Sequence, residues 1–313
     1  MSSCKAKLNN KVAIIGAGDV GAAAANMLIL QSATSELLIV DINAALKNAQ
    51  VSDLSDVSYV CGSKTRVRAA THQEAAQSDI VLITIGSKYY AGETSVQHTY
   101  QKLSIIRSVI SSMKPFGTNT ILLVVANPVD LFTSFIHDIA GLPETRVIGS
   151  GTWLDAIRVS SILAEKAKMA ASSINLPILG IHGNSQVVAW SAAIVDDTSL
   201  DEALSSAALN RDEVLNECES RKQKMIRGKG KMSLGIGSLV ARICQAIISD
   251  NGSVCNISHF QPNWGCCFSL PAVLGKAGIV KTFEMPLNSS ELRFLEVSAR
   301  DLKDRLATIY EQK

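Results

Sequence analysis

Short, wholly apolar segments alternate with helical patterns through the first half of the chain. The apolar segments are Val12–Ile15, Leu37–Val40, Ile80–Ile85 and Ile121–Val125, with a further short strand at Arg66–Ala69. Helical patterns separate them at Ala22–Leu30, Ala44–Tyr59 and Tyr100–Met113. Strands that are apolar on both faces are typical of a parallel sheet covered by helices. Residues 1–150 are therefore predicted to form a doubly wound α/β domain of the Rossmann type.

Residues 151–313 carry a more mixed pattern, and the boundary between the two parts is expected near Ser150. Helices are predicted at Trp153–Met169, Ser199–Ile226, Ile236–Ile248 and Ser289–Tyr310. Extended segments are predicted at Leu179–His182 and Val187–Ile194, and sheet with loops between Val254 and Val273. This mixture predicts an α+β domain that follows the doubly wound sheet.

A glycine-rich turn follows the first apolar segment and precedes a helical pattern. It reads Gly16-Ala17-Gly18-Asp19-Val20-Gly21, and we refer to residues 16–21 as the Gly-rich turn. Between a strand and a helix, this spacing lets the backbone approach a pyrophosphate and lets the helix pack closely on the strand. The helix N-terminus then offers N–H donors to the phosphates. The turn predicts a dinucleotide site that includes Gly16, Gly18, Asp19, Val20 and Gly21.

Two further residues extend this predicted cofactor site. Asp41 ends the second apolar segment, twenty residues after Gly21. A carboxylate at this place accepts hydrogen bonds from the adenosine ribose and repels a 2′-phosphate, so NAD is predicted rather than NADP. Gly86 closes the segment Ile80–Ile85 at the same edge of the sheet and is included in the predicted cofactor site.

Composition and charge exclude several other classes of protein. The chain has 313 residues, of which 47% are hydrophobic and 19% charged, with a net charge of +2, so it contains enough apolar material for a packed core. The short basic stretch Arg221–Lys231 is interpreted as a solvated helix face, and no nucleic-acid partner is expected. No apolar run approaches the length of a bilayer span. Seven cysteines without a CxxC pair indicate a reduced, cytoplasmic protein without a metal site.

Several segments beyond the Gly-rich turn resemble signature segments of the L-lactate/malate dehydrogenase family. They are Ala126–Asp130, Arg146–Gly151, Leu154–Arg158, Gly180–Gly183 and Leu270–Gly275. The resemblance runs from about Lys11 to the C-terminal helix. The residues around Asp130 and Ser150 are more similar to those of the lactate branch of the family. It implies hydride transfer between a nicotinamide and a 2-oxo or 2-hydroxy acid, in a homodimer or homotetramer.

The resemblance also implies roles for four residues. His182 would exchange a proton with the 2-oxygen of the substrate, and Asp155 would orient its imidazole and favour the charged form. Arg158 would hold the substrate carboxylate through two parallel hydrogen bonds. Asn127 would contact the nicotinamide side of the site and the substrate.

The substrate loop departs from the family pattern. In ungapped register, Ser95 stands where the family has an arginine that stabilises charge on the carbonyl oxygen. Tyr89 stands at the position that selects the substrate, and Met232 replaces a small or hydroxyl residue opposite it. With Trp153 before Leu154, these residues predict a pocket too apolar for malate or oxaloacetate, and a bulkier apolar 2-oxo acid is conceivable. Lys88 or Lys102 could supply the lost charge.

Two functions follow from these observations. The first is an NAD-dependent oxidoreductase similar to L-lactate dehydrogenase, with weak activity or altered specificity. The second is a catalytically inactive NAD-binding protein with a sensing or scaffold role. The pair of His182 with Asp155, and Arg158, favour the enzyme, whereas Ser95 favours the inactive protein, because loss of one charge-stabilising donor costs about 100- to 1,000-fold in rate.

Overall fold

The computed structural model describes residues 10–86, 92–183, 185–204 and 210–311. These residues form one 11-stranded sheet and a separate three-stranded sheet. In spatial order, the large sheet contains β3 (Arg66–Ala69), β2 (Glu36–Val40), β1 (Lys11–Ile15), β4 (Ile80–Ile83), β5 (Ile121–Val124), β6 (Val147–Gly149), β12 (Val254–Gln261), β13 (Cys266–Gly275), β8 (Ile178–Gly180) and β9 (Gln186–Val188), with β14 (Gly278–Thr282) beside β13. The small sheet contains β11 (Thr198–Ser199), β10 (Ile194–Val195) and β7 (Ile174–Asn175).

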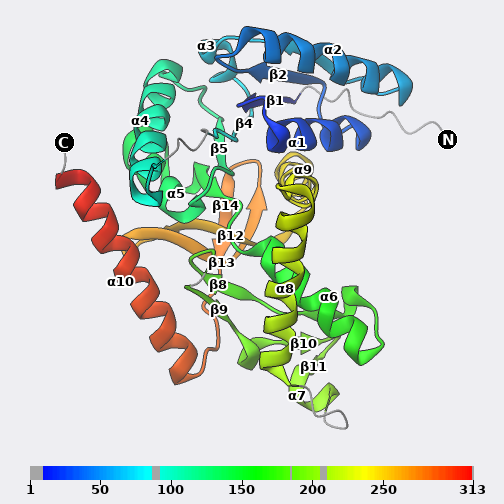
Figure 1. Cartoon of the computed structure of the whole chain (residues 1–313), viewed down its shortest axis with the longest axis vertical. Coiled ribbons are helices and arrows are strands. Elements are labelled where there is room, and N and C mark those ends of the chain that lie inside the picture. Colours follow the sequence, from blue (N-terminus) through cyan, green and yellow to red (C-terminus); the bar gives the residue numbers. More distant parts are fainter. Residues whose placement is uncertain (1–9, 87–91, 184, 205–209, 312–313) are drawn as a thin grey trace.

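Helices surround these sheets along most of the chain (Figure 1). They are α1 (Asp19–Leu30), α2 (Ala44–Val60), α3 (His72–Ala75), α4 (Ser95–Met113), α5 (Val129–Ala140), α6 (Trp153–Ala167), α7 (Leu200–Ala203), α8 (Arg211–Lys229), α9 (Ser233–Ser249) and α10 (Ser289–Glu311). Single 3-10 turns occur at Glu144–Arg146, Ala171–Ser173 and Trp190–Ala192.

The first six strands of the large sheet, β3-β2-β1-β4-β5-β6, are all parallel. This is the strand order of the doubly wound dinucleotide-binding fold, so the predicted Rossmann class is confirmed. Side chains along β1 alternate between two buried clusters, as the period of a strand requires. Val12 and Ile14 pack on the side of α1 and α9, whereas Ala13 and Ile15 pack on the side of α4 and α5.

The large sheet continues without a break into the second half of the chain. Strand β6 pairs antiparallel with β12, and β12, β13, β8 and β9 follow in antiparallel order. Helix α9 from the second half packs against α1 beside the Gly-rich turn, as Figure 1 shows where the yellow helix meets the blue one. A Cβ at Gly237 of α9 would lie 2.6 Å from the Cβ of Ala23, so only glycine allows this close approach.

Two predicted elements in the second half are wrong in detail. The single helix predicted over Ser199–Ile226 is instead α7 and α8, because each has its own cap: Ser199 accepts from the Glu202 amide, and Asn210 accepts from the Asp212 and Glu213 amides. The extended segment predicted over Val187–Ile194 is interrupted by the 3-10 turn at Trp190–Ala192. Local capping and turn geometry thus overrode the hydrophobic pattern in both cases.

Helix α5 is absent from the sequence-based prediction and is buried on nearly all sides. Its buried residues include Asp130 as well as Phe132 and Phe135. Its sequence does carry a helical apolar period, through Leu131, Phe132, Phe135 and Ile136, so the pattern contained a signal that the prediction overlooked. Among the described residues, no single helix meets the length and hydropathy of a membrane span; α8 and α9 together meet them, but are bent by 113°.

Candidate active site

A cavity of about 920 Å³ lies beyond the carboxyl ends of the parallel strands and is lined by both halves of the chain. Ligands of doubly wound sheets bind at this place. Most of the residues predicted for the cofactor and the substrate line it, namely Gly16, Gly18, Asp19, Val20, Asp41, Gly86, Asn127, Arg158, His182 and Met232. Gly21 and Asp155 lie behind this lining, and Ser95 does not contribute to it.

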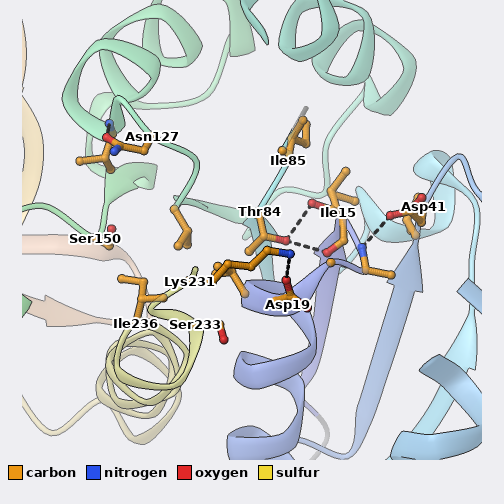
Figure 2. Close-up of a pocket in the computed structure, with 18 of the residues that line it drawn as sticks. Ile15, Asp19, Asp41, Thr84, Ile85, Asn127, Ser150, Lys231, Ser233 and Ile236 are labelled. Carbon is orange, nitrogen blue, oxygen red and sulfur yellow. Dashed lines mark hydrogen bonds and ion pairs between the residues drawn. The ribbon is translucent and has the colours of Figure 1, made fainter. Parts of the chain in front are cut away.

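Two glycines of the Gly-rich turn, Gly16 and Gly21, leave no room for a side chain. Gly16 has φ +109°, and a Cβ there would lie 2.9 Å from the Thr84 carbonyl oxygen. A Cβ at Gly21 would lie 2.1 Å from the Gly16 carbonyl oxygen. The Thr84 hydroxyl fixes the turn by donating to the carbonyls of Ile15 and Gly16, at 3.0 and 2.9 Å (Figure 2).

The start of α1 fits the pyrophosphate of a dinucleotide. A Cβ at Gly18 would meet nothing within 4 Å, so the space beside it is open toward the cavity. Gly18 caps α1 without a side-chain hydrogen bond. The first N–H groups of the helix therefore remain available for an anion.

Asp41 is held rigidly at the end of β2. One carboxylate oxygen accepts from the Ala17 amide and the other from the Asn43 amide, both at 2.8 Å. Each oxygen keeps a lone pair that can accept from a ribose hydroxyl. The geometry fits the predicted role in NAD binding.

A contact across the mouth of the cavity joins its two sides. Lys231, between α8 and α9, donates to the Asp19 carboxylate at the first turn of α1 (Figure 2). Both residues line the cavity. The ammonium group offsets a carboxylate that would repel an incoming phosphate.

His182, Asp155 and Arg158 lie together at the same cavity. The Nδ1 atom of His182 lies 2.6 Å from an Asp155 oxygen, and Arg158 approaches the other oxygen at 3.6 Å. The Asp155 side chain is only 2% exposed, whereas that of His182 is 30% exposed. With Nδ1 turned toward Asp155, the Nε2 atom is the ring nitrogen left for a ligand.

The surroundings of His182 favour its protonated form. Burial opposes the charge, but the hydrogen bond to Asp155 and the negative charges of Asp155 and Asp130 outweigh it, so the pKa of His182 is raised. A raised pKa keeps a proton on the imidazole near neutral pH, as a proton donor requires.

Arg158 and Asn127 complete the predicted polar set. The side chain of Arg158 is 18% exposed, and its guanidinium lies 3.7 Å from the Met232 sulfur. Asn127 follows β5, and Lys102 of α4 donates to its carbonyl at 3.2 Å. Burial lowers the pKa of Lys102. Among the described residues, no group of three or more His, Cys, Asp or Glu side chains could hold a metal ion.

The residues predicted to shape the substrate pocket differ in where the structure places them. Ser95 is the first residue of α4 and is exposed. Tyr89 and Lys88 lie outside the described residues. Trp153, expected beside the pocket, instead packs against the buried cluster on the side of α1 and α9, under the Arg242 guanidinium at 4.8 Å. Its contribution to an apolar pocket was therefore predicted wrongly.

Several lining residues were not predicted from the sequence. They are Thr84, Ser150, Leu154, Lys231, Ser233 and Ile236, among others. Figure 2 shows Ile236 on α9 facing the same space as Ser150 and Asn127. Ser150 and Leu154 belong to segments that resemble family signatures, and Lys231 precedes Met232, so these three could have been identified from the sequence.

A doubly wound sheet, a phosphate-binding turn and a histidine–aspartate pair in one cavity define a nicotinamide-dependent oxidoreductase. The chain belongs to the lactate/malate dehydrogenase family: the NAD-binding domain of that family matches residues 10–149, and its α/β C-terminal domain matches residues 152–313. Its cofactor is accordingly NAD.

Known members of the family are similar over nearly the whole chain. L-lactate dehydrogenase A of Rhizopus oryzae is 36% identical, over 95% of this chain and 92% of its own length. An L-lactate dehydrogenase of Staphylococcus epidermidis is 32% identical, over 97% and 98%. A lactate dehydrogenase from a Medee basin deep-sea metagenome has a similar structure, with a TM-score of 0.92 and 28% identity, covering 97% of this chain and all of that one.

Proposed function

We propose that this protein is an NAD-dependent dehydrogenase of L-2-hydroxy acids that acts on a monocarboxylic substrate, as an L-lactate dehydrogenase does. The observation that carries the proposal is the joint placement of His182, Asp155 and Arg158 in one cavity with the Gly-rich turn and Asp41. Residues 1–150 would bind the dinucleotide, and residues 151–313 would supply most of the catalytic side chains.

The proposed reaction assigns a separate task to each residue. NAD, when bound, accepts or supplies the hydride. Arg158 binds the substrate carboxylate through its planar guanidinium. His182 donates a proton from Nε2 to the carbonyl oxygen during reduction and removes it during oxidation, while Asp155 keeps the imidazole in the required tautomer.

The wall beside Arg158 indicates the substrate class. The Met232 thioether contacts the guanidinium and contributes an apolar surface where a second carboxylate would need a cationic or hydrogen-bonding partner. A 2-oxo acid with an apolar side chain fits this surface better than oxaloacetate does. Pyruvate or a bulkier homologue is therefore the proposed substrate.

The test is NADH oxidation with pyruvate, oxaloacetate and bulkier apolar 2-oxo acids, alongside direct titration of NADH binding. We expect turnover of a monocarboxylic acid and little of oxaloacetate. His182→Asn should lower turnover by about 100-fold or more, because it removes the proton donor, while leaving the Kd for NADH unchanged.

Ser95→Arg separates the proposed enzyme from an inactive NAD-binding protein. If the native protein binds NADH but turns over no 2-oxo acid, and the arginine variant does, the proposal of an active enzyme is wrong. Native turnover that His182→Asn abolishes supports the enzyme whatever Ser95→Arg does.

We further propose that the protein is a cytoplasmic homodimer or homotetramer. The free cysteines, such as Cys61 and Cys266, fit a reducing compartment. Light scattering coupled to size-exclusion chromatography measures the assembly directly, and a monomeric mass would contradict it.

A further inference from the structure

A second buried carboxylate holds His182 from behind. Asp130, near the start of α5, is 1% exposed, and one of its oxygens accepts from the backbone N–H of His182 at 2.7 Å. His182 is thus held at two points by two acidic residues: Asp155 contacts its side chain and Asp130 its main chain.

The backbone around His182 needs a contact that fixes its conformation. Gly180 and Gly183, on either side of His182, have φ +79° and +111°. Glycine adopts positive and negative φ about equally readily. The two glycines alone therefore do not fix the conformation of this turn. The hydrogen bond to Asp130 fixes the turn to α5, which lies in the buried core.

A carboxylate is a costly choice for this contact. The other Asp130 oxygen is buried and has no well-aligned hydrogen bond among the described residues. Burial raises the pKa of Asp130 to about 6, against the opposing effects of Ser258 and of His182. An asparagine would accept the same N–H bond without a buried charge, so the hydrogen bond alone does not explain the acid.

We propose that Asp130 is a positioning residue for His182, whose carboxylate fixes the main chain and whose negative charge helps to keep the imidazole protonated. The catalytic part of this inference rests on the proposed function. Asp130 acts through His182 and does not line the cavity.

Other charged groups also lie near His182 and Asp130. Asp155 and Arg158 approach from α6, and Lys222 approaches from α8 and lowers the pKa of His182. The thiols of Cys266 and Cys267 on β13 lie near Asp130, and burial raises the pKa of both, so they are uncharged near neutral pH. The charges that favour protonated His182 are therefore those of Asp155 and Asp130.

The test is an NMR titration of the histidine rings in the whole protein. His182→Asn identifies the His182 signal, and the titration is then compared between the native chain, Asp130→Asn and Asp138→Asn. Asp138 is on the same helix but lies beside His137, so its change is the matched control. We expect Asp130→Asn to move the midpoint of His182 to lower pH, and Asp138→Asn to leave it in place.

The same variant should shift the enzymatic pH profile. The pH at which 2-oxo acid reduction declines should fall in Asp130→Asn together with the NMR midpoint. Asp130→Ala, which also removes the hydrogen bond, should lower kcat further, by about 10- to 100-fold, because the imidazole is misplaced.

An unchanged or raised His182 midpoint in folded Asp130→Asn overturns the inference. The proposed function fails by a different result, since absent turnover in the native protein leaves the NMR titration readable. A structural role alone would lower stability without moving that midpoint.

Discussion

At the scale of single residues, the negative charge of buried Asp130 lowers the stability of the folded protein. Asp130 has a pKa near 6 in the folded chain and an ordinary value of 3.8. Above pH 6 the carboxylate is charged in both states, so the folded state alone bears the cost of burial. As pH falls from 6 toward 4, the folded chain takes up the proton first and that cost disappears.

Asp130→Asn should therefore stabilise the protein at high pH and not at low pH. We expect the free energy of unfolding to rise by about 1–3 kcal/mol at pH 8, because the buried charge is gone, and to change by less than about 1 kcal/mol at pH 4. Urea unfolding at both pH values measures the difference. Equal effects at pH 4 and pH 8 would contradict the assignment of a buried, ionised Asp130.

The pair of His182 with Asp155 has the opposite pH dependence. Because the pKa of His182 is raised on folding, its contribution to stability is fully present below about 6.5, the ordinary value, and is lost as pH rises through the folded pKa. Both Asp130 and His182 therefore make the free energy of unfolding larger below neutral pH than above it.

At the scale of elements, the segment between α8 and α9 links the substrate side to the cofactor side. Lys231→Gln leaves the Asp19 carboxylate uncompensated beside the pyrophosphate site. We expect the Kd for NADH to rise by roughly three- to tenfold, since both side chains are largely exposed and screened by water. Fluorescence titration of NADH measures this.

Lys229→Gln is the matched control for that change. It removes the same charge from the last turn of α8, at a residue that does not line the cavity. The double variant Lys231→Gln with Asp19→Asn should recover much of the affinity. A similar loss of affinity in Lys229→Gln would mean that only net charge matters.

Helix α9 also provides a sharp test of packing. Gly237→Ala places a Cβ 2.6 Å from the Ala23 Cβ and 2.7 Å from its carbonyl carbon, so α1 must move, and we expect a loss of about 1–3 kcal/mol. Gly235→Ala meets only Leu154 at 3.8 Å. Because alanine favours helices over glycine, this control should be neutral or stabilising by up to about 1 kcal/mol. Thermal unfolding that ranks the two variants in the other order would refute the α1–α9 contact.

At the scale of the whole molecule, the two halves share a sheet and a helix–helix contact. Strand β6 pairs with β12, and α1 packs on α9. We expect one cooperative unfolding transition, with NADH raising its midpoint because it binds only the folded state.

The three tryptophans, Trp153, Trp190 and Trp264, all belong to the second half of the chain. Their fluorescence should therefore change together with far-UV circular dichroism, which reports on both halves. Two separated transitions would show that the halves are independent despite the shared sheet.

The sequence by itself determined the parallel sheet, the Gly-rich turn and the position of Asp41. Each depends on residues close in the chain: apolar strands with period two, glycines at fixed offsets, and an acid at the end of the next strand. Helix α5 was overlooked although its apolar residues follow a helical period, and α7 and α8 were predicted as one helix because their separate caps interrupt the hydrophobic pattern.

Tertiary structure alone decided which distant residues meet. Asp155 and His182 are 27 positions apart, and Asp130 is 52 positions from His182, yet all three converge where strands and helices end. Lys231 reaches Asp19 across 212 positions because α9 packs on α1. Local patterns specify elements, whereas the packing of buried surfaces fixes which ends lie together, and that packing placed Trp153 against the α1/α9 side of the core rather than in the pocket.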